Sequence, residues 1–292
     1  MGPDYEGESW AIYNADTVEV IADMPDASVG FTLYSPPFGD LFVYSQSERD
    51  MGNSSTNGDF INHYRFMLDD LSRIMKPGRV VGVHCSDLPL RKGRDGHIGL
   101  YDFSGDLIRA HIDAGFVYHG RTTIWKDPVV EMQRTKALGL LYKQLKKDSV
   151  MSRTGMPDYM LWFRAPGENN DPITHDAEDV PVSLWQEWAS PVWMNIQQGN
   201  VLNGRLAKSD EDEKHICPLQ LDVIERAIRL YSNFGDVVLD PFNGIGSTGF
   251  EAIRLGRKYI GNELKPEYAA QAARFLAEAE RTRGDLFASG AK

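Results

Sequence analysis

Residues 237–249 place a short apolar strand, a glycine-rich turn and the start of a helix in direct succession. Glycines in such a turn let the backbone approach a ligand closely, and the first turn of the helix presents amide N–H groups without partners in the helix. Gly244, Gly246 and Gly249 also fit the spacing G-x-G-x-x-G, which alone is a weak dinucleotide motif. The run therefore predicts a nucleotide-type site at the end of a strand in an α/β fold.

The position of this run decides how the sheet must be built. Asp240 stands only 52 residues before residue 292, which leaves too little chain for the later strands of a domain that begins there. Strand and helix patterns alternate through the earlier sequence, so we expect a mostly parallel sheet flanked by helices. The expected strands are 29–34, 79–85, 116–125, 158–164, 237–239 and 257–261, and the expected helices are 60–75, 103–114, 217–230, 247–255 and 266–283.

Asp240, Pro241 and Phe242 stand directly ahead of the glycines and separate two candidate ligands. A carboxylate at this point would repel the pyrophosphate of a dinucleotide, whereas it suits the cationic methionine end of S-adenosylmethionine. Asn262 and Glu263 follow the next expected strand, at the distance where a carboxylate takes ribose hydroxyls. No lysine follows the last glycine, which excludes a Walker-type phosphate loop, and an NAD-dependent oxidoreductase is the competing interpretation.

A second motif, Ser35-Pro36-Pro37-Phe38, follows the expected strand 29–34. Two prolines fix the backbone and remove two N–H donors, so the Ser35 hydroxyl and the Pro36 carbonyl remain as acceptors. Two acceptors that hold the hydrogens of an exocyclic base amine would aim its lone pair at a methyl donor, and Phe38 would stack on the base. Alone, a proline pair predicts a rigid turn; beside the cofactor loop it predicts a transfer site.

Together the two motifs resemble those of the amino-methyltransferases of DNA, the N6-adenine/N4-cytosine family. That family carries (Asp/Ser/Asn)-Pro-Pro-(Tyr/Phe) and Asp-Pro-Phe-x-Gly-x-Gly-(Ser/Thr)-Thr, which residues 35–38 and 240–248 match in the circularly permuted β-type order. The resemblance implies a Rossmann-like fold, S-adenosylmethionine as cofactor, and flipping of a base from double-stranded DNA. It assigns catalysis to Ser35, Pro36, Pro37 and Phe38, and cofactor binding to Asp16, Asp240, Pro241, Phe242, Gly244, Gly246, Ser247, Thr248, Asn262, Glu263, His215 and Cys217.

The identity of the target base rests on the first residue of the catalytic motif. Serine there is usual in cytosine N4 enzymes and aspartate in adenine N6 enzymes, but residues 34–50 resemble orphan methyltransferases of phages and mobile elements, some of which act on adenine despite the serine. We therefore favour adenine N6 slightly and keep cytosine N4 as the alternative. A cytosine C5 enzyme is disfavoured, because its nucleophilic cysteine follows a proline, whereas Cys217 precedes one and Cys85 has none beside it. Methylation of RNA or of a protein glutamine, and a DNA-binding module without catalysis, are weaker alternatives.

The charge pattern bears on the DNA contact. A net charge of −11 argues against nucleic-acid binding over the whole surface of the protein, since phosphate binding relies on Lys and Arg. Residues 126–153 nevertheless carry seven cations against three acids, which suits a local groove, although a solvated helix face explains the charge equally well. We expect residues 1–125 and 214–292 to form the catalytic domain and 126–213 an inserted target-recognition region, with DNA contacts from Lys126, Arg134, Lys136, Lys143, Lys146, Lys147 and Arg153.

The remaining expectations concern surroundings and partners. Two cysteines cannot form a disulfide framework, and no signal peptide or run of ~20 apolar residues is present, so we expect a bacterial or phage-encoded protein of the cytoplasm without a membrane partner. The seven histidines show no metal-ligand spacing, and surface or core positions are expected for each. Residues 39–59 are polar and rich in Ser, Asn and Gly, which is typical of a mobile lid. The sequence leaves open a homodimer, the recognition sequence and a restriction partner.

Overall fold

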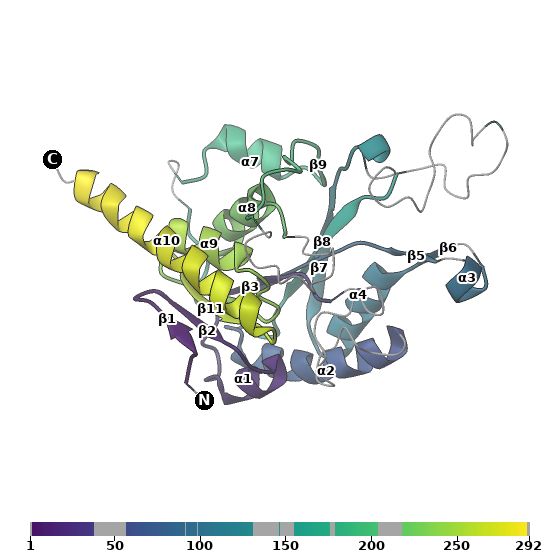
Figure 1. Cartoon of the computed structure of the whole chain (residues 1–292), viewed down its shortest axis with the longest axis horizontal. Coiled ribbons are helices and arrows are strands. Elements are labelled where there is room, and N and C mark those ends of the chain that lie inside the picture. The colour runs from purple at the N-terminus through teal and green to yellow at the C-terminus, as the bar shows by residue number, and fades with distance from the viewer. Residues whose placement is uncertain are drawn as a thin grey trace.

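The computed structural model describes residues 2–37, 57–90, 92–97, 99–130, 146, 155–175, 179–203 and 218–290. A nine-stranded sheet crosses this part of the chain, and helices cover both of its faces (Figure 1). The spatial order of the strands is β1 (Tyr5–Glu6), β2 (Trp10–Tyr13), β11 (Lys258–Asn262), β10 (Val237–Asp240), β3 (Phe31–Tyr34), β4 (Val80–Cys85), β8 (Asp158–Arg164), β7 (Val117–Ile124) and β9 (Val192–Trp193).

The centre of the sheet is parallel, as the alternating pattern predicted. Strands β2, β11, β10, β3 and β4 all pair in parallel, so their carboxyl ends share one edge. Strand β8 runs antiparallel to both of its neighbours, β4 and β7, and β1 runs antiparallel to β2. Because β10 lies between β11 and β3, the last part of the chain completes a sheet begun by the first part, in agreement with the permuted motif order.

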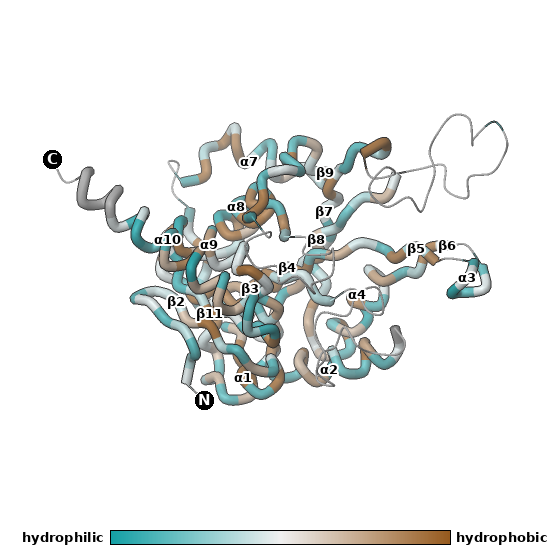
Figure 2. Tube along the Cα trace, viewed as in Figure 1, coloured by the Kyte–Doolittle hydropathy of each residue, from teal (hydrophilic) through white to brown (hydrophobic). Residues whose placement is uncertain are grey.

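The helices form one layer on each face of the sheet. Helices α8 (Leu221–Tyr231), α9 (Ser247–Arg254) and α10 (Pro266–Gly290) pack on one face, and α1 (Thr17–Asp23), α2 (Asn57–Ile74) and α4 (Phe103–Asp113) pack on the other. Hydrophobic and hydrophilic residues alternate along these helices, so that each presents an apolar side to the sheet (Figure 2). None of the helices in the described ranges is long and apolar enough to cross a membrane.

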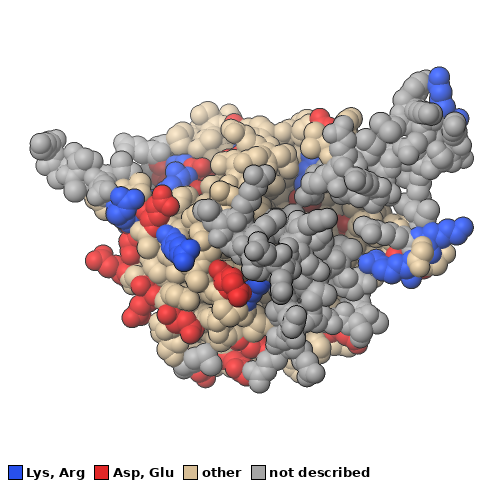
Figure 3. Space-filling view, viewed as in Figure 1, with Lys and Arg blue, Asp and Glu red and all other residues tan. Residues whose placement is uncertain are grey.

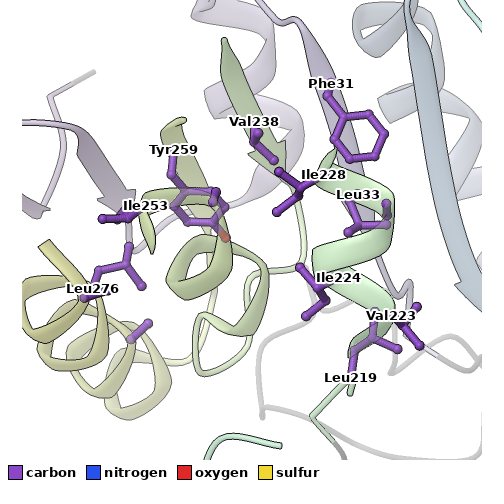
Figure 4. Packing of buried hydrophobic residues seen from close by; sticks show 14 of the residues in the cluster. Phe31, Leu33, Leu219, Val223, Ile224, Ile228, Val238, Ile253, Tyr259 and Leu276 are labelled. Carbon is purple, nitrogen blue, oxygen red and sulfur yellow. The ribbon is translucent and has the colours of Figure 1, made fainter. Parts of the chain in front are cut away.

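Helix α8 ties together the two strands that carry the motifs. Figure 4 shows Ile224 and Ile228 of this helix beside Leu33 of β3 and Val238 of β10, and all four side chains are fully buried. Burying an aliphatic side chain of this size stabilises a fold by roughly 1.5–3 kcal/mol. Packing on α8 therefore holds β3 and β10 at a fixed separation before any ligand binds.

The expected insertion at residues 126–213 needs correction, because β8 lies inside it. This strand pairs with β4 from Tyr159 to Arg164 and lies inside the sheet, between β4 and β7. Its side chains are mostly buried because helices cover both faces, with Phe163 against His111 of α4 and Trp162 against Tyr231 of α8, which explains the nearly continuous apolar run from Tyr159 to Phe163. An insertion between β7 and β8 is thus confined to residues 126–157, of which 131–145 and 147–154 lie outside the described residues.

Short elements account for the other differences from the expected pattern. The chain after residue 165 contains α7 (Val182–Trp188) and β9, neither of which was among the expected elements. A small hairpin of β5 (Leu88–Leu90) and β6 (Gly99–Tyr101) carries α3 (Lys92–Asp95) between its strands and extends from the body of the protein (Figure 1). Elements of two to four residues have too little periodicity to be predicted. The expected lid is outside the described residues except for 57–59, where α2 begins.

Candidate active site

The two motifs meet at the same edge of the sheet. Strands β3 and β10 are hydrogen-bonded neighbours, with Val238 opposite Phe31 and Leu239 opposite Thr32, so Ser35 and Asp240 both stand where parallel strands end. Two contacts directly join the end of β3, where the proline motif begins, to the cofactor motif. The Thr248 hydroxyl of the cofactor motif lies 3.5 Å from the Leu33 carbonyl, and the rings of Tyr34 and Phe242 lie 5.6 Å apart between centroids. The sequence motifs at the two ends of the chain therefore build one site.

The cofactor loop is a tight backbone turn that opens onto a helix. The Asp240 carboxylate accepts the backbone N–H of Phe242 at 2.9 Å, and Pro241 is buried behind the turn. Gly244 and Gly246 have φ values of +52° and +86°, a region that favours glycine. Helix α9 starts directly after Gly246, so its first amide groups point toward the space beside β10. This geometry is the one predicted for residues 240–249.

Asp240 is a buried acid whose ionisation is costly in the ligand-free protein. Burial raises its pKa to about 7, and hydrogen bonds from the Phe242 amide and the Thr248 hydroxyl offset this only in part. A buried carboxyl with no cation beside it among the described residues is a site that a positively charged ligand group would stabilise. The cationic methionine end of S-adenosylmethionine has the charge that this position calls for.

Glu263 stands on the neighbouring strand end and closes the other side of the loop. Its carboxylate accepts the backbone N–H of Gly244 at 2.8 Å and that of Lys265 at 2.9 Å. Its own backbone N–H donates to the Tyr13 carbonyl at the end of β2. The carboxylate is thereby held at the rim of the glycine loop, where ribose hydroxyls would reach it.

Asn262 and Asp16 lie together beside this rim. The Asn262 side-chain amide donates to the Thr17 hydroxyl at 3.1 Å, while its side-chain oxygen is buried and has no hydrogen-bond partner in the described part of the chain. Asp16 caps helix α1 by accepting the Val18 N–H at 2.9 Å. The orphaned oxygen, the two carboxylates of Asp16 and Glu263 and the open glycine turn match the donors of an adenosine-containing ligand, so these residues fit S-adenosylmethionine.

A chain of polar contacts extends from the catalytic motif across the sheet. The Ser35 hydroxyl lies 2.8 Å from His84 Nδ1, His84 Nε2 lies 3.2 Å from Asp158 Oδ2, and Lys126 Nζ lies 2.5 Å from the same oxygen. Burial alone would raise the pKa of Asp158, but the hydrogen bond from His84 and the charge of Lys126 lower it below its ordinary value. The sequence did not single out His84 and Asp158, which join Ser35 in this chain of contacts, and Lys126 was expected on a DNA-contacting surface.

That placement of Lys126 needs correction as well. Its side chain is only 8% exposed, and its ammonium is engaged by Asp158, so it has no exposed charge to offer to a phosphate. Among the other expected DNA contacts, Lys146 is exposed. Phe38 of the catalytic motif, His215 and Cys217 of the cofactor set, and the remaining five cations, Arg134, Lys136, Lys143, Lys147 and Arg153, lie outside the described residues. Ser247 and Thr248 are buried at the start of α9, and Pro36 is buried beside a half-buried Ser35.

A second hollow, of about 860 Å³, lies at the opposite edge of the sheet and does not belong to this site. Charged residues line it, and several of them pair with each other: Lys76 Nζ lies 2.6 Å from Asp171, and Arg229 lies 3.6 Å from Asp179. The cations of Lys76 and Arg229 are thus paired with acids, which argues against a role in binding an anionic substrate.

The fold and the site define the class. A Rossmann-like sheet that carries a buried acid, a glycine turn and a carboxylate at the rim of that turn, next to a proline turn on the neighbouring strand, is that of an S-adenosylmethionine-dependent methyltransferase. The chain belongs to the DNA methylase family of N6/N4 methyltransferases, whose model matches residues 29–274. Family membership excludes the competing NAD-dependent oxidoreductase.

Individual relatives agree with the family. The chain is 36% identical to the type II methyltransferase M1.MboII of Moraxella bovis over 119 residues, 37% of this chain and 44% of that protein. It is 40% identical to the DNA adenine methyltransferase YhdJ of Escherichia coli over 167 residues, 52% of this chain and 50% of that protein. The matched region thus spans half or less of the length of these two relatives.

Solved structures share the fold along almost the whole chain. The putative DNA modification methylase TTHA0409 of Thermus thermophilus, in complex with S-adenosyl-L-methionine, superposes with a TM-score of 0.66 at 22% identity, covering 92% of this chain and 95% of that one. The cytosine-N4-specific PvuII DNA methyltransferase gives a TM-score of 0.66 at 18% identity, covering 97% and 95%. At these identities the likeness establishes the fold.

Proposed function

We propose that this protein transfers a methyl group from S-adenosylmethionine to an exocyclic amino group of a base in double-stranded DNA. The observation that carries the proposal is the junction of β3 and β10, which sets the acceptors of Ser35 and Pro36 beside a loop shaped for the cofactor. Nothing in this chemistry requires a covalent bond between protein and base; positioning and preorganised dipoles supply the rate.

The chain's residues divide the work between two ligands. S-adenosylmethionine supplies an electrophilic methyl group on a sulfonium when it is bound. Asp240 would pair with its methionine end, Glu263 would accept its ribose hydroxyls, and Asp16 would contact its adenine. On the facing side, the Ser35 oxygen and the Pro36 carbonyl would each accept one hydrogen of the target amine and turn its lone pair toward the methyl group. The flipped base would leave the DNA stack to reach this corner.

Adenine N6 is our first choice of target, on the strength of the 40% identity to an adenine methyltransferase. Cytosine N4 is the second candidate, favoured by the serine at position 35 and by the shared fold with a cytosine-N4-specific enzyme. Both bases present an exocyclic amine next to a ring nitrogen, so the same pair of acceptors suits either one.

The distribution of charge supports a DNA groove on one side of the molecule. Acidic side chains are most numerous over β1, β2, α1 and α10, where some Lys and Arg lie among them, whereas Lys and Arg predominate at the α3 hairpin on the other side of the same view (Figure 3). Because DNA is a polyanion, it would approach the carboxyl edge of the sheet from the side away from the acids. We assign target recognition to residues 126–157, which connect β7 and β8 at that edge.

The test is to incubate the protein with S-adenosylmethionine and mixed-sequence DNA, digest the DNA and identify methylated nucleosides by mass spectrometry. We expect N6-methyladenine, and Ser35→Ala should lower its formation by about 100-fold or more while cofactor affinity stays unchanged. Ser28→Ala is a matched control, because Ser28 lies at the other end of β3 and only bonds to the Pro25 carbonyl. Full activity of Ser35→Ala would refute the proposed mechanism, and N4-methylcytosine would select the second target.

A further inference from the structure

The contacts around His84 determine which of its ring nitrogens carries a proton. Asp158 is 6% exposed, and its lowered pKa keeps it ionised, so its Oδ2 can only accept hydrogen bonds. His84 Nε2, at 3.2 Å from that oxygen, must therefore be the N–H end of the ring. In a neutral imidazole the other nitrogen, Nδ1, is then an acceptor, and it lies 2.8 Å from the Ser35 hydroxyl. Ser35 consequently donates its proton to His84.

This direction of donation decides what Ser35 presents to a substrate. A hydroxyl has one hydrogen and two lone pairs, and when the hydrogen is committed to His84 only lone pairs face the opposite side. An amine N–H on that side meets an acceptor, which is what the proposed reaction requires. Without His84 the hydroxyl hydrogen would be free to rotate toward the amine and compete with this contact.

We propose that His84, oriented by Asp158 and Lys126, is a positioning residue that makes Ser35 an acceptor and receives the proton released by the reaction. The inference rests on the proposed function. As the bond from the amine nitrogen to the methyl carbon forms, the bond from that carbon to sulfur breaks and leaves its electron pair on sulfur. The amine nitrogen then carries a positive charge, which it loses by passing a proton to Ser35 Oγ while the serine's own proton moves to His84 Nδ1. The resulting imidazolium pairs with Asp158 and later releases its proton to water.

The groups that surround His84 suit this cycle. It is 8% exposed and is faced by Ser35 after β3, Asp158 at the start of β8 and Lys126 after β7. Its neighbour Cys85 points to the opposite face of β4, into the core. Lys126 neutralises Asp158 while the histidine is uncharged, so the buried carboxylate is paired at every stage.

The first test is a double-mutant cycle on single-turnover methyl transfer to DNA. We expect His84→Ala to slow transfer by about 100-fold or more and Ser35→Ala to mask this effect, so that the double variant is no slower than Ser35→Ala alone. Added imidazole should restore part of the rate of His84→Ala and none of that of Ser35→Ala. His63→Ala, an exposed histidine on α2, is the control.

A second measurement does not depend on activity. Nitrogen-15 NMR of the ligand-free protein, with the His84 signal assigned through His84→Ala, reports the ring tautomer, and we expect the Nε2–H form. The Nδ1–H form, or additive losses in the two single variants, would overturn the role of His84 while leaving methylation in place. If the wild type produces no methylated DNA, the proposed function fails instead, and the NMR result still decides whether His84 accepts from Ser35.

Discussion

Lowering the pH from 7.5 to 5.5 is expected to weaken the binding of S-adenosylmethionine, because its methionine end requires Asp240 to be ionised. Burial raises the pKa of this carboxyl to about 7 in the ligand-free protein. With that value, the ionised fraction falls from roughly three quarters to about 3% over these two pH units, so the dissociation constant should rise about 25-fold, or by about 2 kcal/mol. A carboxyl with an ordinary pKa near 3.8 would remain ionised throughout and produce no change.

Isothermal titration calorimetry measures both parts of this prediction. At pH 6.5, binding should release about three quarters of a proton, because the ligand's positive charge drives Asp240, which is protonated to that extent at a pKa of about 7, to ionise; titrations in buffers of different ionisation enthalpy measure this release. Asp240→Asn should bind weakly, with an affinity that does not vary between pH 5.5 and 7.5, and it also reports any titration of the ligand itself. A wild-type affinity that is flat over this range, or proton release that persists in Asp240→Asn, would refute the assignment.

The same pKa has a consequence for folding, and its sign is opposite to that of most acids. The folded protein holds a proton on Asp240 that the unfolded chain gives up near pH 3.8, so the folded state binds more protons between these values. This contribution to stability is complete at low pH and is lost as the pH rises through about 7. Asp240 is therefore a source of instability in the empty protein at neutral pH, and in its proposed role cofactor binding would relieve this cost.

Two further predictions concern the scaffold. Gly246→Ala should lower the free energy of unfolding by about 1–3 kcal/mol in thermal denaturation and should also weaken cofactor binding. The reason is that Gly246 has a φ of +86° and a Cβ there would stand 2.9 Å from Leu276 Cδ1. Gly199→Ala is the control and should have little effect, because a Cβ at Gly199 would meet open space. Arg79→Met should cost about 3–5 kcal/mol in urea denaturation, because it removes the buried guanidinium that pairs with Asp236 and leaves only the more distant Lys76 Nζ, at 3.5 Å, beside that buried carboxylate. The exposed pair of Arg65 and Asp113 is the control, and Arg65→Met should cost about 1 kcal/mol or less. Equal losses from Arg79→Met and Arg65→Met would contradict the importance of burial.

Much of the fold followed from local pattern. Long periodic helices such as α2 and α4, and the strands of 4–8 residues on either side of them, were identified within a few residues of their observed limits. The pairing of strands could not be predicted from the same pattern, because apolar periodicity shows that a strand is buried but not which strand lies beside it. Strand β8 illustrates this: its limits were predicted correctly, yet it was assigned to an insertion instead of the centre of the sheet.

The residues of the candidate site were predictable to the same extent: those in contiguous motifs were identified, and those brought together by strand pairing were not. Ser35 and Asp240 were found because each sits in a contiguous motif whose residue types dictate a turn. His84 and Asp158 were missed because they come from strands 74 positions apart, and only the pairing of β4 with β8 brings them together. The signal in the sequence was one polar residue near the end of each of two largely apolar strands, His84 next to the last residue of β4 and Asp158 at the first residue of β8. Lys126 was misplaced because a count of charges does not show which of them is buried.

Lys126 and Asp158 also mark the two points at which residues 127–157 leave and rejoin the sheet. Their ion pair links the stem of that excursion across β7 and β8, and Asp158 at the same time holds His84. A different excursion could therefore be grafted between these two anchors without altering the strands or the proposed proton path through His84. In such a design, residues 127–157 would select the DNA sequence and the residues around Ser35 would act on the base, with the Asp158 carboxylate as the contact between the two regions. The sequence specificity could then be exchanged while the reaction centre is left intact.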